Sequence, residues 1–467
     1  MALNAACVFE FRTTGNAANG GGFKTGASGT DRSQSDTPHA TLTTLSVVSA
    51  ATDVVTVSLT DYTVTTNDVG NIWRNTGGTS TAGWYEIIAV DTGLNTWQLD
   101  RAVGTAAQTC AGRMGGAIST FQDAFFETLE PGNKVWIKAG TYNMTESLSV
   151  AKDGTSNKHI VIEGYNSARG DAPVVGSGNQ PSLVATASNF TLIFDDRWSF
   201  FNLQYTQGAT QTAGWRADTN TEIRECKGII SNNSTSAECF DFSVSNALLI
   251  SNCEASIGGA SGVGFVLSGG TPGTARECYI HGGSTGIVAG TGLKLLKTII
   301  AGATTAIDFT TTAEGWIVDQ CTLYGAETPA GTGIDIDNIL ENIQITNTII
   351  YGFTTGINQA TGVSTTALID YNNFFNNTTD RTNVEVGAHD TALDPQFTNA
   401  AAGDFSVGAN MKAVGFPGVF PGGLSTGYLD IGAVQRQEPA AGGGGDVKRG
   451  VEYYSRSKRE VHSVKHR

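Results

Sequence analysis

The chain has 467 residues, of which 59 are glycine, 15% are charged and 40% are hydrophobic. The charged fraction lies well below the roughly 25% of ordinary globular chains, which excludes long helices as the main architecture and favours turn-rich β-structure. The formal net charge of −15 disfavours a general affinity for nucleic acid or anionic membranes, because an acidic surface repels phosphate.

The sequence contains no run of about 18 apolar residues, which a membrane-spanning helix would require. The opening residues, MALNAACVFEFRTTG, lack a basic stretch followed by an apolar core. We therefore expect no membrane span and no standard secretory signal.

The first 115 residues divide into two parts. Residues 1–45 are rich in Gly, Ser, Thr and Asn with little periodicity, which predicts an extended arm that is ordered by a partner or by the structure that follows. Residues 46–115 contain four alternating segments separated by Gly/Thr turns, VVTVSL, NIWRN, GWYEIIAV and TWQLDR. This pattern predicts a small antiparallel β-domain.

The middle of the chain repeats at intervals of 20 to 27 residues, which is the range of stacked structural repeats. Each repeat has a short apolar segment, a bend and a Gly or Asn turn. The reference column of the alignment reads Leu203, Cys226, Cys253, Cys278, Thr298, Cys321, Thr348 and Asn373.

Two further columns accompany this one. Positions two residues later share its strand face, while positions three residues earlier have an odd offset, so a bend must lie between the two strands. Gly228 interrupts the later column and predicts a bulge or a slip of register at that rung. The later column is Tyr205, Gly228, Ala255, Ile280, Ile300, Leu323, Ile350 and Phe375, and the earlier one is Phe200, Ile223, Ile250, Ala275, Leu295, Val318, Ile345 and Asp370.

A coil of about 24 residues with several short strands and inward side chains that stack on one another describes a parallel β-helix. We expect about a dozen coils over residues 116–435. The aligned cysteines could form a metal or redox site, but the same column accepts Leu and Thr, so we interpret the thiols as packing groups. No required metal or cofactor is predicted.

Two segments resemble the right-handed parallel β-helix, or pectin-lyase-like, superfamily. A V-W-I-K-A-G-T-Y strand (Val135–Tyr142) is similar to the strand that opens the helix. A D-P-x-F…D-F…D-I-G-A-x-Q pattern (Asp394, Phe397, Asp404, Phe405 and 430–435) is similar to the segment that closes it. The resemblance implies a right-handed helix, and it leaves function open because this fold supports lyases, hydrolases, tailspikes and inert shafts.

The N-terminal segment VFEFRTTGNAANGGGF (residues 8–23) and the following GASGTDRSQSD resemble the N-termini of β-helix proteins encoded by tailed phages. This resemblance implies a non-enzymatic structural component of a virion, such as a decoration, fibre-like or vertex protein, assembled in the host cytoplasm. It also implies a possible homotrimer and contacts with other capsid or tail proteins. Partners among nucleic acids and membranes are not expected, because of the acidic net charge.

The alternative function is a tailspike-like polysaccharide lyase or hydrolase, or a module that binds a host glycan. The best carboxylate pair is Asp335 and Asp337, which share one strand face at about 6 to 7 Å. Asp308 and Asp319 precede them by roughly two coils and one coil, so a carboxylate cluster is the alternative interpretation. Surface solvation is the preferred one, because outward carboxylates are common on a β-helix and this chain is acidic. His159 and His281 are isolated in the sequence, and we interpret both as structural.

The C-terminus separates into a Gly-rich linker, residues 436–445, and a basic tail, residues 446–467. The tail has seven Lys/Arg and three Asp/Glu, so it carries about +4 and the remainder of the chain about −19. Because Tyr and Arg are favoured anchors of docked peptides, we predict that the tail docks on another virion protein. The predicted anchors are Arg449, Tyr453, Tyr454 and Arg456.

Overall fold

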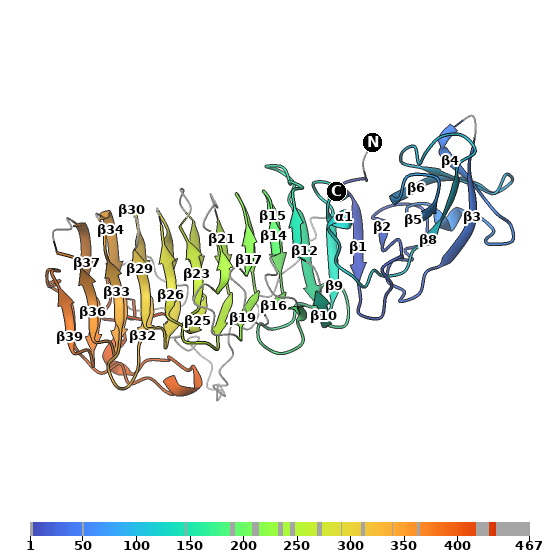
Figure 1. Ribbon diagram of the computed structural model, residues 1–467. Helices are drawn as coiled ribbons and strands as arrows, with labels where there is room; N and C mark the ends of the chain where they lie inside the picture. Colours follow the sequence, from blue (N-terminus) through green and yellow to red (C-terminus); the bar gives the residue numbers. More distant parts are fainter. Residues whose placement is uncertain are drawn as a thin grey trace, which may run out of the picture.

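The structure is a computed structural model. It describes residues 3–48, 51–144, 147–186, 192–207, 214–231, 237–242, 248–268, 273–290, 292–309, 313–338, 340–361, 365–416 and 429–435. The fold is all-β, with a small barrel at one end of a long right-handed parallel β-helix (Figure 1). Within the described residues, no helix is long and apolar enough to cross a membrane.

The barrel is a closed antiparallel sheet with its own core, in which Trp73, Trp97 and Tyr85 are buried. The predicted boundary at residue 46 lies inside its first strand, which begins at Ala40. A short 3₁₀ turn, η1 (Thr66–Asp68), lies between the strands that come second and third along the chain. In sheet order the strands are β3 (Ala40–Val48), β4 (Ala51–Val57), β7 (Thr96–Leu99), β6 (Gly83–Asp91), β5 (Ile72–Gly78) and β8 (Thr109–Met114).

Each coil of the β-helix contributes strands to three sheets, here called sheets 1, 2 and 3, whose strands pair in parallel except for β2, which pairs antiparallel with β1 in sheet 1. Sheets 2 and 3 have ten strands each, slightly fewer rungs than the dozen predicted. Sheet 1 consists of β2 (Gly22–Lys24), β1 (Cys7–Phe11), β9 (Lys134–Lys138), β12 (Ile160–Tyr165), β15 (Trp198–Phe201), β18 (Glu222–Arg224), β21 (Leu249–Ser251), β24 (Thr274–Arg276), β27 (Lys294–Leu296), β31 (Ile317–Asp319), β34 (Leu340–Thr346), β30 (Ala313–Glu314) and β37 (Thr365–Asp370).

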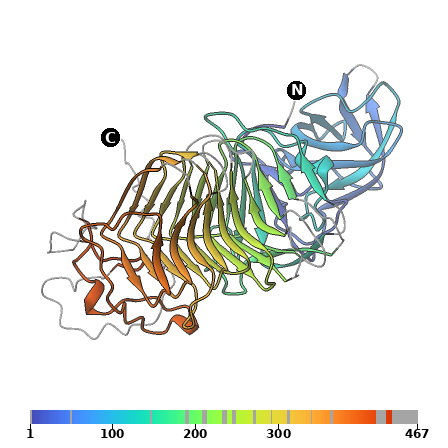
Figure 2. The same cartoon turned by 60° about the vertical axis from the view of Figure 1, so that its left-hand side comes forward.

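The other two sheets run alongside it (Figure 2). Sheet 2 consists of β10 (Gly140–Met144), β13 (Pro181–Ala185), β16 (Gln204–Gln207), β19 (Lys227–Ile230), β22 (Glu254–Ile257), β25 (Tyr279–Gly282), β28 (Ile299–Ala301), β32 (Thr322–Tyr324), β35 (Ile349–Tyr351) and β38 (Asn373–Phe375). Sheet 3 consists of β11 (Leu148–Val150), β14 (Leu192–Phe194), β17 (Trp215–Ala217), β20 (Glu238–Asp241), β23 (Val263–Leu267), β26 (Thr285–Ala289), β29 (Thr305–Phe309), β33 (Thr332–Ile336), β36 (Thr355–Gln359) and β39 (Thr379–Thr382).

The predicted columns are confirmed residue for residue over seven of the eight repeats, from Leu203 to Thr348. The predicted alignment of the eighth repeat is wrong by one residue. Asn372, rather than Asn373, continues the reference column, and Phe374 and Ile369 replace Phe375 and Asp370 in the flanking columns. With this correction, the earlier column is apolar in every rung, and its first seven members are all buried, as is Phe374 of the later column.

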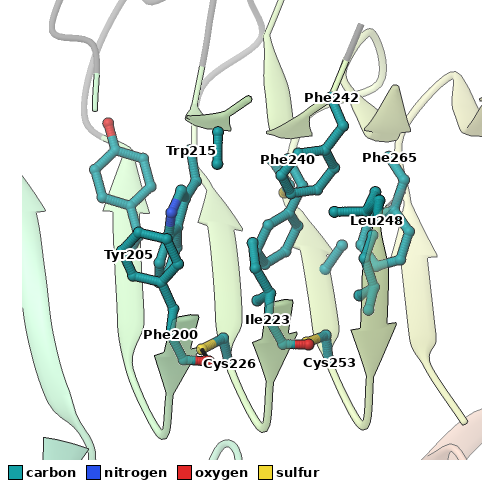
Figure 3. Packing of buried hydrophobic residues seen from close by; sticks show 14 of the residues in the cluster. Phe200, Tyr205, Trp215, Ile223, Cys226, Phe240, Phe242, Leu248, Cys253 and Phe265 are labelled. Carbon is teal, nitrogen blue, oxygen red and sulfur yellow. Dashed lines mark hydrogen bonds between the residues drawn. The ribbon is translucent and has the colours of Figure 1, made fainter. Parts of the chain in front are cut away.

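Gly228 causes no bulge, contrary to the prediction. It pairs in register with Tyr205 and Ala255. A Cβ on Gly228 would lie 2.8 Å from Cε2 of Phe240, so the aromatic ring of the facing sheet fills the space that a side chain would take. Figure 3 shows how closely the aromatic rings of successive rungs pack in this part of the core.

The bend between sheets 1 and 2 is a single residue in the left-handed conformation. It directly precedes the reference column, and its φ lies between 49° and 58° in eight successive coils. L-residues avoid this region because Cβ approaches the following carbonyl oxygen, and Asn tolerates it best among non-glycine residues. The corner residues are Asn202, Glu225, Asn252, Glu277, Lys297, Gln320, Asn347 and Tyr371.

The reference column stabilises this corner. Cys226 Sγ donates to the Arg224 carbonyl at 3.2 Å, and Thr298 Oγ1 donates to the Leu296 carbonyl at 3.1 Å. Cys253 makes the same contact with Ser251 at 3.4 Å, and Cys226 and Cys253 stack on successive rungs (Figure 3). Every member of the column except Leu203 donates in this way to the carbonyl two residues earlier, so the column favours small side chains with a hydrogen-bond donor.

Both ends of the helical core are covered. At the N-terminal end, β1 of the predicted arm pairs in parallel with β9, and the short helix α1 (Asp123–Phe126) buries Phe125 and Phe126 against the core. At the C-terminal end, partly buried Val384 packs against the last rungs.

The barrel is joined to this N-terminal cap by Trp84. Its ring lies 5.4 Å from that of Phe125, and the Arg74 guanidinium lies 4.3 Å from the Trp84 ring. Ile72, another residue of the barrel wall, is also buried in the core of the helix rather than in that of the barrel. These residues therefore pack the barrel directly against the N-terminal end of the shaft.

The segment that was expected to close the helix lies along the outer face of sheet 2 instead. Phe405 packs against Ile299 and Ala301, and Met411 packs against Ile349. This segment, called here the strap, comprises residues 392–416 and 429–435, includes the 3₁₀ turns η2 (Ala400–Ala402) and η3 (Ala409–Met411), and runs back beside the last rungs (Figure 2). The apolar outer residues of those rungs explain the difference, because they would otherwise be exposed to water.

Lys297→Val should lower the free energy of unfolding by about 1–2 kcal/mol, because a β-branched side chain is strained at the left-handed corner. Lys297→Gly should stay within about 1 kcal/mol of the parent protein, since glycine accepts this conformation. Denaturant unfolding of the two variants provides the measurement. Equal stability would contradict the account of the corner.

Candidate functional site

Two of the four predicted carboxylates are neighbours on the outer face of sheet 3. Asp308 in β29 and Asp335 in β33 pair in register on adjacent rungs. Asp335 Oδ1 accepts a hydrogen bond of 2.8 Å from Asn358 Nδ2. Asp337 follows β33 and is exposed. Asp308 therefore lies one coil before Asp335, rather than two.

Asp308 is the unusual member of this group. Burial raises its pKa to about 6, and the charges of Asp335 and Asp337 add to the effect. Its Oδ1 atom is buried and has no hydrogen-bond partner within the described residues. The pair thus combines a carboxyl group whose pKa is raised with a hydrogen-bonded carboxyl group on the next rung.

Asp319 does not belong to this face, contrary to the prediction. It ends β31 in sheet 1. Its Oδ1 accepts hydrogen bonds from Thr346 Oγ1 at 2.8 Å and Asn347 Nδ2 at 2.7 Å. The carboxylate therefore connects two neighbouring rungs of sheet 1. Asp308 and Asp335 lie on sheet 3, because the bend that follows Asp319 carries the chain onto a different face.

A second cluster lies on the outer face of sheet 2, where three successive rungs present Lys227, Glu254 and Tyr279 in one column. Lys227 Nζ lies 2.8 Å from Glu254 Oε1. His281 Nε2, which is two residues past Tyr279 on the same strand, lies 3.1 Å from the same oxygen. The Tyr279 and His281 rings stack with their centroids 4.7 Å apart.

The electrostatics of this cluster depend on Glu254. Burial pushes its pKa upward, but hydrogen bonds from His281 and Lys227 outweigh burial and hold the pKa below its ordinary value. Burial also raises the pKa of Tyr279, and the charge of Glu254 adds to this. Glu254 therefore remains ionised while the phenol beside it stays protonated.

The ion pair determines the chemistry of the imidazole. An ionised carboxylate can only accept hydrogen bonds, so Nε2 of His281 is the donor and Nδ1 of the neutral ring carries the lone pair. Nδ1 has no hydrogen bond within the described part of the chain. The side chain of His281 is one-third exposed, and its ring is oriented by the contact between Nε2 and Glu254.

The cluster lies between two coverings of sheet 2. On the N-terminal side, Gln180 Nε2 donates to the Glu225 carbonyl at 2.7 Å and holds the loop 166–180 against these rungs. On the C-terminal side, the Phe405 ring of the strap lies 6.4 Å from that of Tyr279. The loop therefore reaches the rungs of Lys227 and Glu254, and the strap reaches the rung of Tyr279.

The sequence interpretation missed this cluster because it treated His281 as isolated. The offset of three residues from Cys278 correctly places His281 on the outer face. The confirmed register also brings it beside Glu254, a residue that is 27 positions away. Reading the outer columns as well as the inner one would have found Lys227, Glu254 and Tyr279 in one line.

The aligned cysteines have a structural role. All seven cysteines are free and buried, and burial raises the pKa of Cys278 to about 12. Within the described ranges, no group of three or more His, Cys, Asp or Glu side chains is arranged to hold a metal ion. The predicted docking residues Arg449, Tyr453, Tyr454 and Arg456 lie outside the described residues.

Comparison with known proteins gives few matches. A family described as a domain of unknown function (DUF5123) matches residues 316–416. No curated protein matches the chain. Among solved structures, pectate lyase Pel9A is 13% identical with a TM-score of 0.42, and the similarity covers 69% of this chain and 92% of that one.

Two further structures have lower similarity. The catalytic unit of the GH87 α-1,3-glucanase from Streptomyces thermodiastaticus is 12% identical with a TM-score of 0.33, covering 69% of this chain and 85% of that one. The PL6 alginate lyase AlyGC is 10% identical with a TM-score of 0.20, covering 61% and 56%. All three act on polysaccharides, and none is similar enough to assign an activity to this chain.

Asp308→Asn should stabilise the protein at pH 7 by about 1 kcal/mol, after a discount for the half-exposed position of this carboxyl. The folded state binds the Asp308 proton more tightly than the unfolded chain does, so this residue's contribution to stability falls as the pH rises from about 4 to about 6. Denaturant unfolding at pH 4 and pH 7 should show the gain only at the higher pH. A gain of equal size at both values would contradict the raised pKa.

Proposed function

We propose that the protein is a β-helical polysaccharide depolymerase in which the partly exposed His281 acts as a general base on the outer face of sheet 2. The observation that carries the proposal is the 3.1 Å contact between His281 Nε2 and Glu254 Oε1. A carboxylate that orients an imidazole is a recurrent way to present a base near neutral pH.

The chemistry that this arrangement supports best is β-elimination on a uronate-containing glycan. His281 Nδ1 takes the proton from the carbon next to the uronate carboxyl group. The electron pair of that C–H bond forms a carbon–carbon double bond, the glycosidic C–O bond at the neighbouring carbon breaks, and the leaving oxygen takes a proton from water.

Lys227 would support this step electrostatically. Its ammonium has three donors, one of which contacts Glu254, so two remain for the carboxyl group of a substrate. Neutralising that group favours proton removal, because negative charge develops beside it in the transition state. Throughout the step, Glu254 holds Nε2 of the imidazole, so that Nδ1 faces the substrate and can accept the proton.

The carboxyl pair on sheet 3 offers a second candidate chemistry. Asp308, whose pKa is raised to about 6, lies one rung from Asp335, and the rung spacing of about 4.8 Å approaches the separation of about 5–5.5 Å used by retaining glycosidases. Hydrolysis there would give reducing ends without a double bond. The two candidate sites therefore predict different products.

Incubation with polygalacturonate, alginate and chondroitin should release products with the ultraviolet absorbance of an unsaturated uronate. His281→Ala should lower the rate at least about 100-fold, as expected when a general base is lost. His159→Ala is the matched control, because His159 contacts Ser199 at 2.8 Å on sheet 1, and it should keep the parent rate.

The outcomes separate the candidate functions. Unsaturated products at an equal rate from His281→Ala would contradict the assigned base. Reducing ends without unsaturation, abolished by Asp335→Asn, would move the activity to sheet 3. Binding of a glycan without turnover would identify a glycan-binding module.

A structural role in a tailed-phage virion is the second proposed function. The resemblance of residues 8–23 to phage proteins supports it, as does the direct packing of the barrel against the shaft through Trp84. Other virion proteins are the proposed partners, the basic tail is the proposed docking peptide, and homotrimerisation is proposed by analogy. A tailspike would combine this role with glycan cleavage.

Deletion of residues 446–467 should leave the thermal unfolding of the shaft unchanged and reduce incorporation into virus particles. The Gly-rich linker separates the tail from the folded body, so the tail adds little to its stability. Particle-associated protein can be compared between full-length and truncated chains. Incorporation at the full-length level would assign attachment to the N-terminal region.

A further inference from the structure

We infer that the loop 166–180 is a positioning element of the sheet 2 site, in which Gln180 and Gly176 hold the carboxylate of Glu254 against His281. The inference rests on the proposed function for its catalytic meaning. Its structural basis is a chain of contacts that runs from the loop to the carboxylate.

The loop is held at its beginning by the N-terminal region. Arg169 Nε lies 2.7 Å from Glu10 Oε2, and the Glu10 side chain is fully buried. The same guanidinium donates to Ser33 Oγ at 2.9 Å. Asp171 accepts hydrogen bonds from the backbone amides of 166–168, so the first half of the loop has a defined shape.

The loop is held at its end by Gln180, whose residue surface is only 3% exposed. Its Nε2 donates to the Glu225 carbonyl at 2.7 Å, and its Oε1 accepts from the Gly176 amide at 3.1 Å. Glu225 is the left-handed corner residue two positions before Lys227. One buried side chain therefore connects Gly176 to the rung that carries Lys227.

Gly176 lies directly over the ion pair. A Cβ at this position would lie 3.0 Å from Glu254 Oε2 and 3.5 Å from Lys227 Nζ. The φ of Gly176 is +73°, a conformation that favours glycine. The bare backbone of Gly176 thus lies beside Oε2, whereas His281 Nε2 contacts the other carboxylate oxygen, Oε1. The backbone therefore limits how far the carboxylate of Glu254 can rotate away from the imidazole.

Gly176→Ala tests this contact, and Gly178→Ala is its matched control. Gly178 lies in the same loop with a φ of +78°, and a Cβ at this position would have no other atom within 4 Å. Both alanines suffer the same backbone strain, so similar losses of thermal stability are expected. Only the alanine at position 176 meets Glu254.

The readout is the titration of the Glu254 carboxyl carbon followed by NMR in the full chain, together with the pH dependence of glycan cleavage. In Gly176→Ala the pH of half-titration should rise, because displacing the carboxylate weakens the hydrogen bonds that keep it ionised. The acid limb of the cleavage profile reports protonation of the base, His281, so it should move to lower pH when the contact with the Glu254 carboxylate is weakened. Gly178→Ala should match the parent protein in both measurements.

Gln180→Leu provides a second variant that leaves Gly176 unchanged. Releasing the loop from Glu225 should shift the Glu254 titration in the same direction as Gly176→Ala. Identical Glu254 titration in the parent, Gly176→Ala and Gln180→Leu proteins would overturn the inference, even if glycan cleavage is observed. A shifted titration without cleavage of any glycan would support the positioning role and reject the proposed function.

Discussion

The hydrogen bond across the left-handed corner is the contact on which the rest of the solenoid depends. A side chain of the reference column donates to the carbonyl two residues earlier, as Cys226, Cys253 and Thr298 do. The residue between donor and acceptor has a positive φ in eight successive coils. Repetition of this unit keeps the register constant from rung to rung, so side chains far apart in sequence meet on one face.

The sequence alone predicts the fold well because inward side chains are repetitive. The apolar columns and the odd offset between them are sufficient to place the bend and the strands over seven coils. The last coil is misaligned because Asp370 and Asn373 look equivalent to their neighbours Ile369 and Asn372 until the pairing is known. Gly228 looks like a defect in the sequence because the ring that fills its space comes from another sheet.

The candidate site can be predicted only in part, because outward residues obey no single pattern. Asp308 and Asp335 are grouped correctly, whereas Asp319 is wrongly added because a sequence interval does not reveal which sheet a residue occupies. His281 looks isolated because its partner is one coil away. The coverings on either side of it, loop 166–180 and the strap, contact sheet 2 through long-range contacts that have no repeat.

A crystal structure of Glu254→Gln soaked with a uronate oligosaccharide tests the central claim most directly, because this variant should bind substrate while turning it over slowly. The account predicts a sugar on the outer face of sheet 2, with its carboxyl group at Lys227 and a C–H bond facing Nδ1 of His281. An oligosaccharide bound at Asp308 and Asp335 on sheet 3 instead would contradict it.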